Sequence, residues 1–352
     1  MLLSGIDMMQ LYNAVNEVLS TLDFDALYTG FRKYPFALYS SKEIVLGGEI
    51  IPYQESFRGN TSIMYAGEYT AIWNIEIDPV DDPELLAYCL VHEMFHCHQR
   101  VNRESRYPSD FALLQYPADM GNFIKKYHEN KYLADALDQS DPDLLRKFVY
   151  IRESRYKSYP FMVRQEWKAE TLEGMAEYVG LKALANINAS KYHAVVETYL
   201  DKLRSESEML FDIRQISYYT GTVYFLCLEK FGLSVCNDFD SEQTAYEQNR
   251  IHVKDVSAEI YPVDWICQKY TQRMQEKNVK IREFVDQSQY KKCQAFICGY
   301  DPMNMFRLGD RIYCSHFIAL EENGEVKTIT SEVVLQLAEG SAQNVIGYYT
   351  RF

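Results

Sequence analysis

The chain has 352 residues and a formal net charge of −14, which excludes proteins that bind nucleic acids or anionic membranes through a broad basic face. Its 47% hydrophobic and 24% charged residues are ordinary for a soluble globular protein with material for two or three domains. We find no apolar run of about 18 residues and no N-terminal secretory segment. We therefore expect no membrane and no nucleic-acid partner. The eight scattered cysteines are expected to be reduced thiols in a cytoplasmic protein.

The N-terminal part predicts one helix and a small sheet. Apolar residues from Met8 to Leu22 recur at helical spacing. Two strand-like runs, residues 36–51 and 61–77, follow and are separated by a polar turn region that contains glycine. They predict a small, mainly antiparallel sheet, and we interpret residues 1–80 as a helix-and-sheet lobe.

A mainly helical region follows, and after it a β-rich one. Asp82 suits an N-cap and Pro83 a first helical position. The residues from Leu85 to Leu90 are apolar nearly all round, so the helix that they start should be buried. Asn323-Gly324 predicts a hairpin turn. We expect a helical lobe over residues 81–278 and a β-rich unit over 279–352, with helices over 122–137, 141–159, 163–185, 213–232 and 263–277, and strands over 294–300, 311–321, 325–329 and 332–337.

The stretch "LLAYCLVHEMFHCHQR" contains the pattern H-E-x-x-H. His92 and His96 are four residues apart, so both imidazoles lie on one helix face and can reach one tetrahedral zinc ion. Glu93 stands beside His92, where a carboxylate can take a proton from a metal-activated water. His98 points away from that face, and we interpret it as a structural or surface residue. Two histidines do not complete a catalytic site, so a third ligand must come from elsewhere.

The third ligand is not next to the histidines. The metzincin pattern would place glycine three residues and histidine six residues after His96, but Gln99 and Asn102 stand there. The remaining source is a carboxylate from a later helix. The stretch "EWKAETLEGMAEYVG" aligns four carboxylates along one helix face: Glu166, Glu170, Glu173 and Glu177. Because much of this helix is expected to be buried, these carboxylates require a positively charged partner.

The stretch "ETLEGMAEY", together with the H-E-x-x-H pattern, resembles the motifs of the gluzincins, zinc peptidases of the thermolysin and aminopeptidase N kind. The resemblance covers about the middle third of the chain. It implies that Glu173 is the third zinc ligand and that Glu177 orients a ligand histidine. It also implies that Gly174 lets two helices approach closely. The aminopeptidase pattern G-x-M-E-N is missing, so an endopeptidase is favoured over an aminopeptidase.

A peptidase also needs donors that stabilise the oxyanion. Arg214 and Tyr218 lie one turn apart on one helix face, and the resemblance implies that Tyr218 has this role, with Tyr219 as the alternative. Arg152 and Arg155 could neutralise part of the glutamate stripe, although an exposed basic face is an equally good interpretation.

The resemblance implies a thermolysin-like, two-lobed α+β core that hydrolyses peptide or protein substrates with zinc. The strand over residues 69–77 would be an edge strand that pairs with extended substrate. The alternatives are a catalytically silent relative that binds peptides or a protein partner, and a helical scaffold without metal. The predicted site consists of the zinc ligands His92, His96 and Glu173, the orienting Glu177, the general base Glu93, and Tyr218 or Arg214 at the oxyanion.

Overall fold

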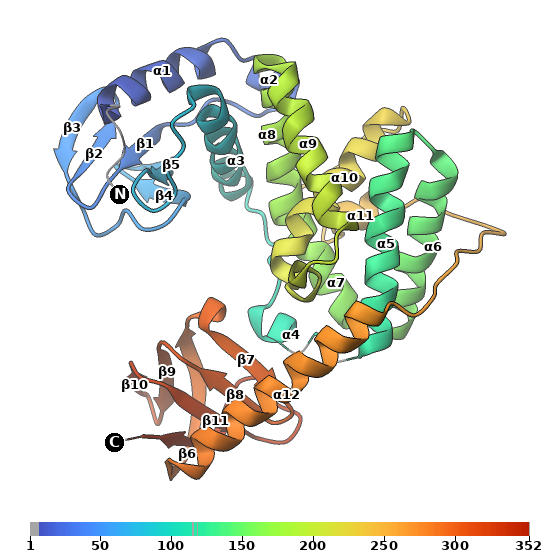
Figure 1. The fold of residues 1–352 in the computed structure, drawn as a ribbon. Coiled ribbons are helices and arrows are strands. Elements are labelled where there is room, and N and C mark those ends of the chain that lie inside the picture. The colour runs from blue at the N-terminus through green and yellow to red at the C-terminus, as the bar shows by residue number, and fades with distance from the viewer. Residues whose placement is uncertain (1–6, 115, 118, 352) are drawn as a thin grey trace. The chain divides into compact units, whose positions relative to one another are not determined.

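The computed structural model describes residues 7–114, 116–117 and 119–351, and Figure 1 shows its course. It contains two sheets and many helices, which confirms the predicted α+β class. Contacts divide the chain into two compact units. The first comprises the described residues up to Tyr107 together with 127–153 and 166–258, and the second comprises 108–126, 154–165 and the described residues from Glu259 onward.

The first unit contains a five-stranded sheet with the order β3-β2-β1-β5-β4. Only β1 and β5 pair in parallel, so the sheet is mainly antiparallel as predicted. The strands are β1 (Phe36–Tyr39), β2 (Glu43–Leu46), β3 (Glu49–Pro52), β4 (Thr61–Tyr65) and β5 (Glu68–Asn74).

The expectation that residues 69–77 form an edge strand is wrong. β5 lies between β1 and β4, and β3 and β4 are the edges. Ala71, Ile72 and Trp73 are consecutive buried residues. Such a run suits a strand that has a neighbour on both sides and is covered on both faces.

The first unit also contains the helix α3, which carries the two predicted histidine ligands. Asp82 caps α3 by accepting hydrogen bonds from the N–H groups of Glu84 and Leu85 at 2.9 and 3.2 Å, and Pro83 is the first helical residue, as predicted. The helix over residues 189–204 is not among the helices predicted from the sequence. The helices are α1 (Met8–Ser20), α2 (Phe24–Leu27), α3 (Pro83–Val101), α8 (Met175–Ile187), α9 (Ala189–Arg204), the 3₁₀ turn Glu208–Phe211, α10 (Ile213–Lys230) and α11 (Ala245–Gln248).

Three further helices, α5 (Met120–Gln139), α6 (Pro142–Ser158) and α7 (Pro160–Ala169), contribute residues to both units. α7 runs directly into a π-helical turn, Glu170–Gly174, and then into α8. In this turn the N–H of Met175 donates to the carbonyl of Glu170, five residues earlier. The predicted helix over residues 163–185 therefore exists, but it contains one wider turn at the position of the expected zinc ligand.

The second unit contains a seven-stranded antiparallel sheet with the order β10-β9-β6-β12-β11-β8-β7. Asn323 and Gly324 join β9 and β10 with φ values of 54° and 83°, which confirms the predicted hairpin. The elements are α4 (Asp110–Leu114), α12 (Asp264–Asp286), β6 (Gln289–Tyr300), the 3₁₀ turn Pro302–Asn304, β7 (Met305–Leu308), β8 (Arg311–Cys314), β9 (Ile318–Glu322), β10 (Glu325–Ile329), β11 (Val333–Leu337) and β12 (Asn344–Thr350).

α12 continues nine residues beyond the predicted end at Lys277, because Ile281 and Phe284 recur at helical spacing and are buried. The strands β7 and β12 were not predicted, and the single strand predicted over residues 311–321 is divided into β8 and β9. None of the helices in the described part of the chain is long and apolar enough to cross a membrane.

Candidate metal centre

The metal centre predicted from the sequence is built on two packed helical segments. α3 supplies His92 and His96, and the π-helical turn before α8 supplies Glu173. Leu86, Leu90 and other apolar side chains in the first half of α3 are fully buried. The two histidines therefore project from a helix that is fixed in the core of the first unit.

Three potential ligand atoms converge between these segments. His96 Nε2 lies 3.0 Å from His92 Nε2 and 3.1 Å from Glu173 Oε2, and His92 Nε2 lies 3.7 Å from the same oxygen. Among the described residues, His92, His96 and Glu173 form a group whose ligand atoms all lie within 4.8 Å of one another. This is close enough for all three to bind one metal ion. Ligands of a tetrahedral zinc ion at 2.0–2.2 Å from the metal are about 3.3 Å apart, and the three separations bracket that spacing.

The hydrogen bonds of the two imidazoles determine which atoms are free for a cation. His92 Nδ1 lies 2.7 Å from Glu177 Oε2, and His96 Nδ1 lies 2.7 Å from Gln99 Oε1. Both oxygens accept hydrogen bonds, so both Nδ1 atoms carry the proton and both Nε2 atoms present lone pairs. Two lone pairs and a carboxylate oxygen then face one another with no proton of the neutral side chains between them. The donor set fits a divalent metal ion.

The electrostatics of the three predicted ligand side chains favour positive charge. Burial alone would raise the pKa of Glu173, but His96 and His92 hold it well below its ordinary value. Burial lowers the pKa of His96, but the adjacent Glu173 carboxylate more than offsets this and raises it to about 9. Each group thus stabilises the charged form of the other, as expected where a cation would be held.

Glu93 lies beside these ligands on α3 and is 7% exposed. Burial raises its pKa, and the nearby His92 and His96 counteract only part of this effect. A carboxylate with a raised pKa is more basic than an exposed one, which suits a group that takes a proton from water.

Of the two tyrosines that the sequence left open, Tyr218 faces the metal centre. Its ring is parallel to that of His92, with ring centroids 6.0 Å apart. Burial has the largest effect on the pKa of Tyr218 and raises it, and the Glu173 carboxylate raises it further. Arg214, one turn earlier, lowers it. The Tyr219 hydroxyl instead accepts a hydrogen bond from Lys202 Nζ at 2.8 Å.

The four glutamates expected to share one face divide into two pairs. Arg152 is fully buried and donates to Glu129 at 3.0 Å and to Glu170 at 2.7 Å, with Glu166 3.8 Å away. Glu173 and Glu177 contact the histidines instead. The π-helical turn between the pairs holds one residue more than a regular turn, so the spacing that aligns four residues on a regular helix does not apply. Arg152 is thus the positive partner that was expected.

Arg155 is not the exposed basic residue of the alternative interpretation. It is fully buried, and its guanidinium donates to Asn122 at 3.1 Å and to Tyr116, all within the second unit.

The sequence interpretation missed three side chains that support the ligands. Gln99 accepts from His96 and donates from Nε2 to the carbonyl of Leu172 at 2.9 Å, which ties α3 to the π-helical turn. Tyr88 and Tyr199 both contact Glu177. Tyr88 precedes His92 by four residues and Gln99 follows His96 by three, so their position on the same helix face was the available signal.

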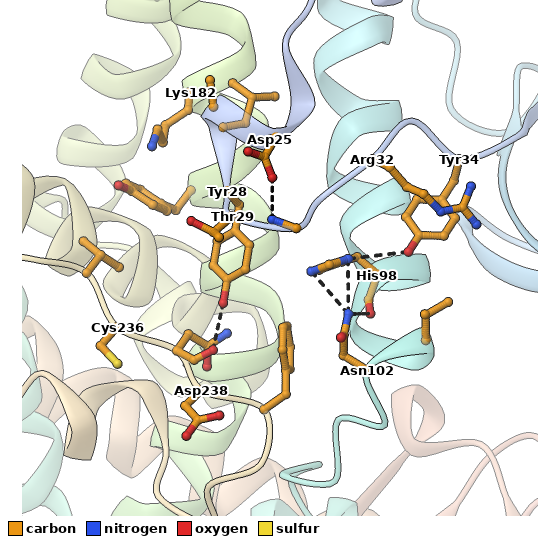
Figure 2. A pocket seen from close by; sticks show the side chains of 18 of the residues that line it. Asp25, Tyr28, Thr29, Arg32, Tyr34, His98, Asn102, Lys182, Cys236 and Asp238 are labelled. Atoms are coloured by element: carbon orange, nitrogen blue, oxygen red, sulfur yellow. Dashed lines mark hydrogen bonds between the residues drawn. The ribbon is translucent and has the colours of Figure 1, made fainter.

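His98 is buried and lies on the other side of α3, where it forms part of the wall of a cavity of about 690 Å³ in the first unit. Figure 2 shows His98 beside Tyr34 and Asn102, whose polar atoms lie 3.5 and 3.2 Å from its Nδ1. Burial, together with the charge of Arg32, lowers its pKa to about 4. Its ring is surrounded at centroid distances of 5.4–6.5 Å by Tyr28, Phe31, Tyr34, Phe95 and Phe239.

No family model matches this chain, and no curated protein and no solved structure matches it either. The interpretation of the site therefore depends on its own geometry.

Proposed function

We propose that this protein is a zinc-dependent metallopeptidase with a gluzincin-like, thermolysin-like core, and that it acts as an endopeptidase on peptide or protein substrates. The observation that carries the proposal is the convergence of two imidazole lone pairs, each oriented by a hydrogen bond at Nδ1, with one carboxylate oxygen. His92, His96 and Glu173 would hold the ion.

A bound zinc ion would supply a Lewis acid and lower the pKa of a water molecule to about 7. The residues of the chain do the remaining work. Glu93 accepts a proton from the attacking water and passes it to the leaving amine. Tyr218, whose raised pKa keeps its hydroxyl protonated, donates a hydrogen bond to the oxygen that becomes negative, and Arg214 adds positive charge on the same helix face.

The alternative is a protein that binds peptides or a partner without hydrolysing them. Glu93 distinguishes the two functions, because a binding protein has no use for a buried carboxylate of raised pKa next to the ligands.

The test is a peptide library incubated with the wild-type chain and with two variants, together with the zinc content of each protein. We expect about one zinc per chain, cleavage by the wild type and by Glu197→Gln, and a loss of at least about 1000-fold in Glu93→Gln, which removes the general base. Glu197 is an exposed residue of α9 and serves as the matched control.

Full activity in Glu93→Gln would contradict the mechanism. Zinc binding without cleavage of any peptide by the wild type would favour the binding protein, and a chain that takes up no zinc would refute the peptidase.

A further inference from the structure

Glu177 is held by two tyrosines as well as by His92. Its carboxylate is 6% exposed. Oε2 faces His92 Nδ1 at 2.7 Å, while Oε1 accepts hydrogen bonds from the hydroxyls of both Tyr88 and Tyr199. The two hydroxyl oxygens are also 2.7 Å apart. One carboxylate thus connects a predicted metal ligand to a compact pair of phenols.

The three groups come from three different helices, which makes the arrangement specific. Tyr88 lies on α3, Glu177 on α8 and Tyr199 on α9. Gly180 leaves room for the ring of Tyr88, because a Cβ atom at position 180 would lie 3.2 Å from that ring. The ring of Tyr199 packs edge-on against Tyr219 with centroids 4.8 Å apart. Neither phenol can move away without disturbing the packing between helices.

A buried carboxylate needs donors for both oxygens, and its orientation follows from where they lie. With both phenols donating to Oε1, the carboxylate group of Glu177 cannot rotate without breaking two hydrogen bonds. Oε2 therefore stays directed at His92. A ligand histidine that donates to a fixed carboxylate keeps its Nε2 lone pair aimed at the metal and binds it more strongly.

We propose that Tyr88 and Tyr199 are positioning residues that fix the Glu177 carboxylate against His92 and so set the metal affinity of the site. The proposal rests on the proposed metal function, but it does not require that the chain hydrolyse peptides. It assigns a role to Tyr88 and Tyr199, whose hydroxyls contact the Glu177 carboxylate.

The test measures zinc affinity by competition with a chromophoric chelator in Tyr88→Phe, Tyr199→Phe and the double variant. We expect the Kd for zinc to rise about 3- to 10-fold in each single variant and about 10- to 100-fold in the double variant. Tyr219→Phe is the matched control, because Tyr219 packs against Tyr199 but hydrogen-bonds Lys202, and its Kd should equal that of the wild type.

Two further measurements separate positioning from loss of structure. The visible spectrum of the cobalt-substituted protein should change in the Tyr88 and Tyr199 variants, because His92 is less constrained. Thermal unfolding of the metal-free variants identifies any that fail to fold, and the remaining single variants then decide. Unchanged zinc Kd and cobalt spectra in all folded variants would overturn the proposal.

The outcomes also separate this proposal from the proposed function. A wild type that binds zinc and cleaves no peptide, with weakened zinc binding in the variants, supports the positioning role and refutes the peptidase. A wild type that cleaves peptides while the variants bind zinc as tightly refutes the positioning role alone. A wild type that binds no zinc overturns both.

Discussion

His98 shows how the surroundings of a residue determine its pKa. It stands two positions from a predicted ligand, yet its ring lies among aromatic side chains and its pKa is lowered to about 4 from its ordinary value of 6.5. The folded protein therefore keeps His98 neutral at a pH where the unfolded chain would protonate it.

This difference predicts a pH dependence of stability. Because the pKa of His98 is lower in the folded state, its neutral form stabilises the folded protein fully above about pH 6.5. This contribution to the free energy of unfolding is lost progressively as the pH falls from 6.5 to about 4. We expect the free energy of unfolding, measured with urea, to fall less steeply over this range in His98→Phe than in the wild type. His252→Gln, which changes an exposed histidine, should keep the wild-type slope. Parallel slopes for wild type and His98→Phe would contradict the prediction.

The π-helical turn is the element on which the predicted metal centre depends. A Cβ atom on Gly174 would lie 2.7 Å from Gly221 Cα, and Thr222 Oγ1 donates to the carbonyl of Gly174 at 3.1 Å. The turn and α10 thus meet backbone to backbone, directly after Glu173. Side chains larger than hydrogen cannot be placed there without moving one of the two elements.

We predict that Gly174→Ala destabilises the protein by about 1–3 kcal/mol, the usual cost of overpacking a core, and weakens zinc binding because Glu173 moves with the turn. Urea unfolding followed by circular dichroism, and the chelator competition, measure the two effects. Gly121→Ala on α5 is the control, since its Cβ would meet only the side chain of Asp119, and it should be neutral or stabilising by up to about 1 kcal/mol. Equal effects of both substitutions would show that the close approach is unimportant.

Local signals explain what could be predicted from the sequence at this scale. Asp82-Pro83, the H-E-x-x-H spacing and Asn323-Gly324 each determine a cap, a helix face or a turn through neighbouring residues, and each matches the structure. The π-helical turn and the interior place of β5 depend on residues far away in the chain, Gly221 on α10 and the strand β1. Spacing along one segment carries no information about such partners. For the same reason Glu173 came from a resemblance and Tyr199 was missed.

At the scale of the whole molecule, the predicted metal ligands all belong to the first unit. A ligand stabilises the folded state that binds it, by about 2.7 kcal/mol at a concentration of 100 times its Kd. A bound metal ion would therefore stabilise the first unit, because unfolding of that unit destroys the site.

We therefore predict that zinc at this concentration slows amide hydrogen exchange about 100-fold in α3 and α8, where exchange requires unfolding of the first unit. Exchange in β11 and β12, in the sheet of the second unit, should not change. Mass spectrometry of the metal-free and zinc-bound chain measures both regions in one experiment. Equal slowing in both units, or none in α3, would contradict the prediction.

The distance along the chain between the predicted ligands also determines when a metal could bind during folding. His96 and Glu173 are 77 residues apart in sequence, and several helices must form between them before the two segments meet. Closing a loop of this length gains nothing until the packed interface exists. The unfolded chain therefore has no complete site, and metal capture at the proposed site would follow the docking of α8 on α3.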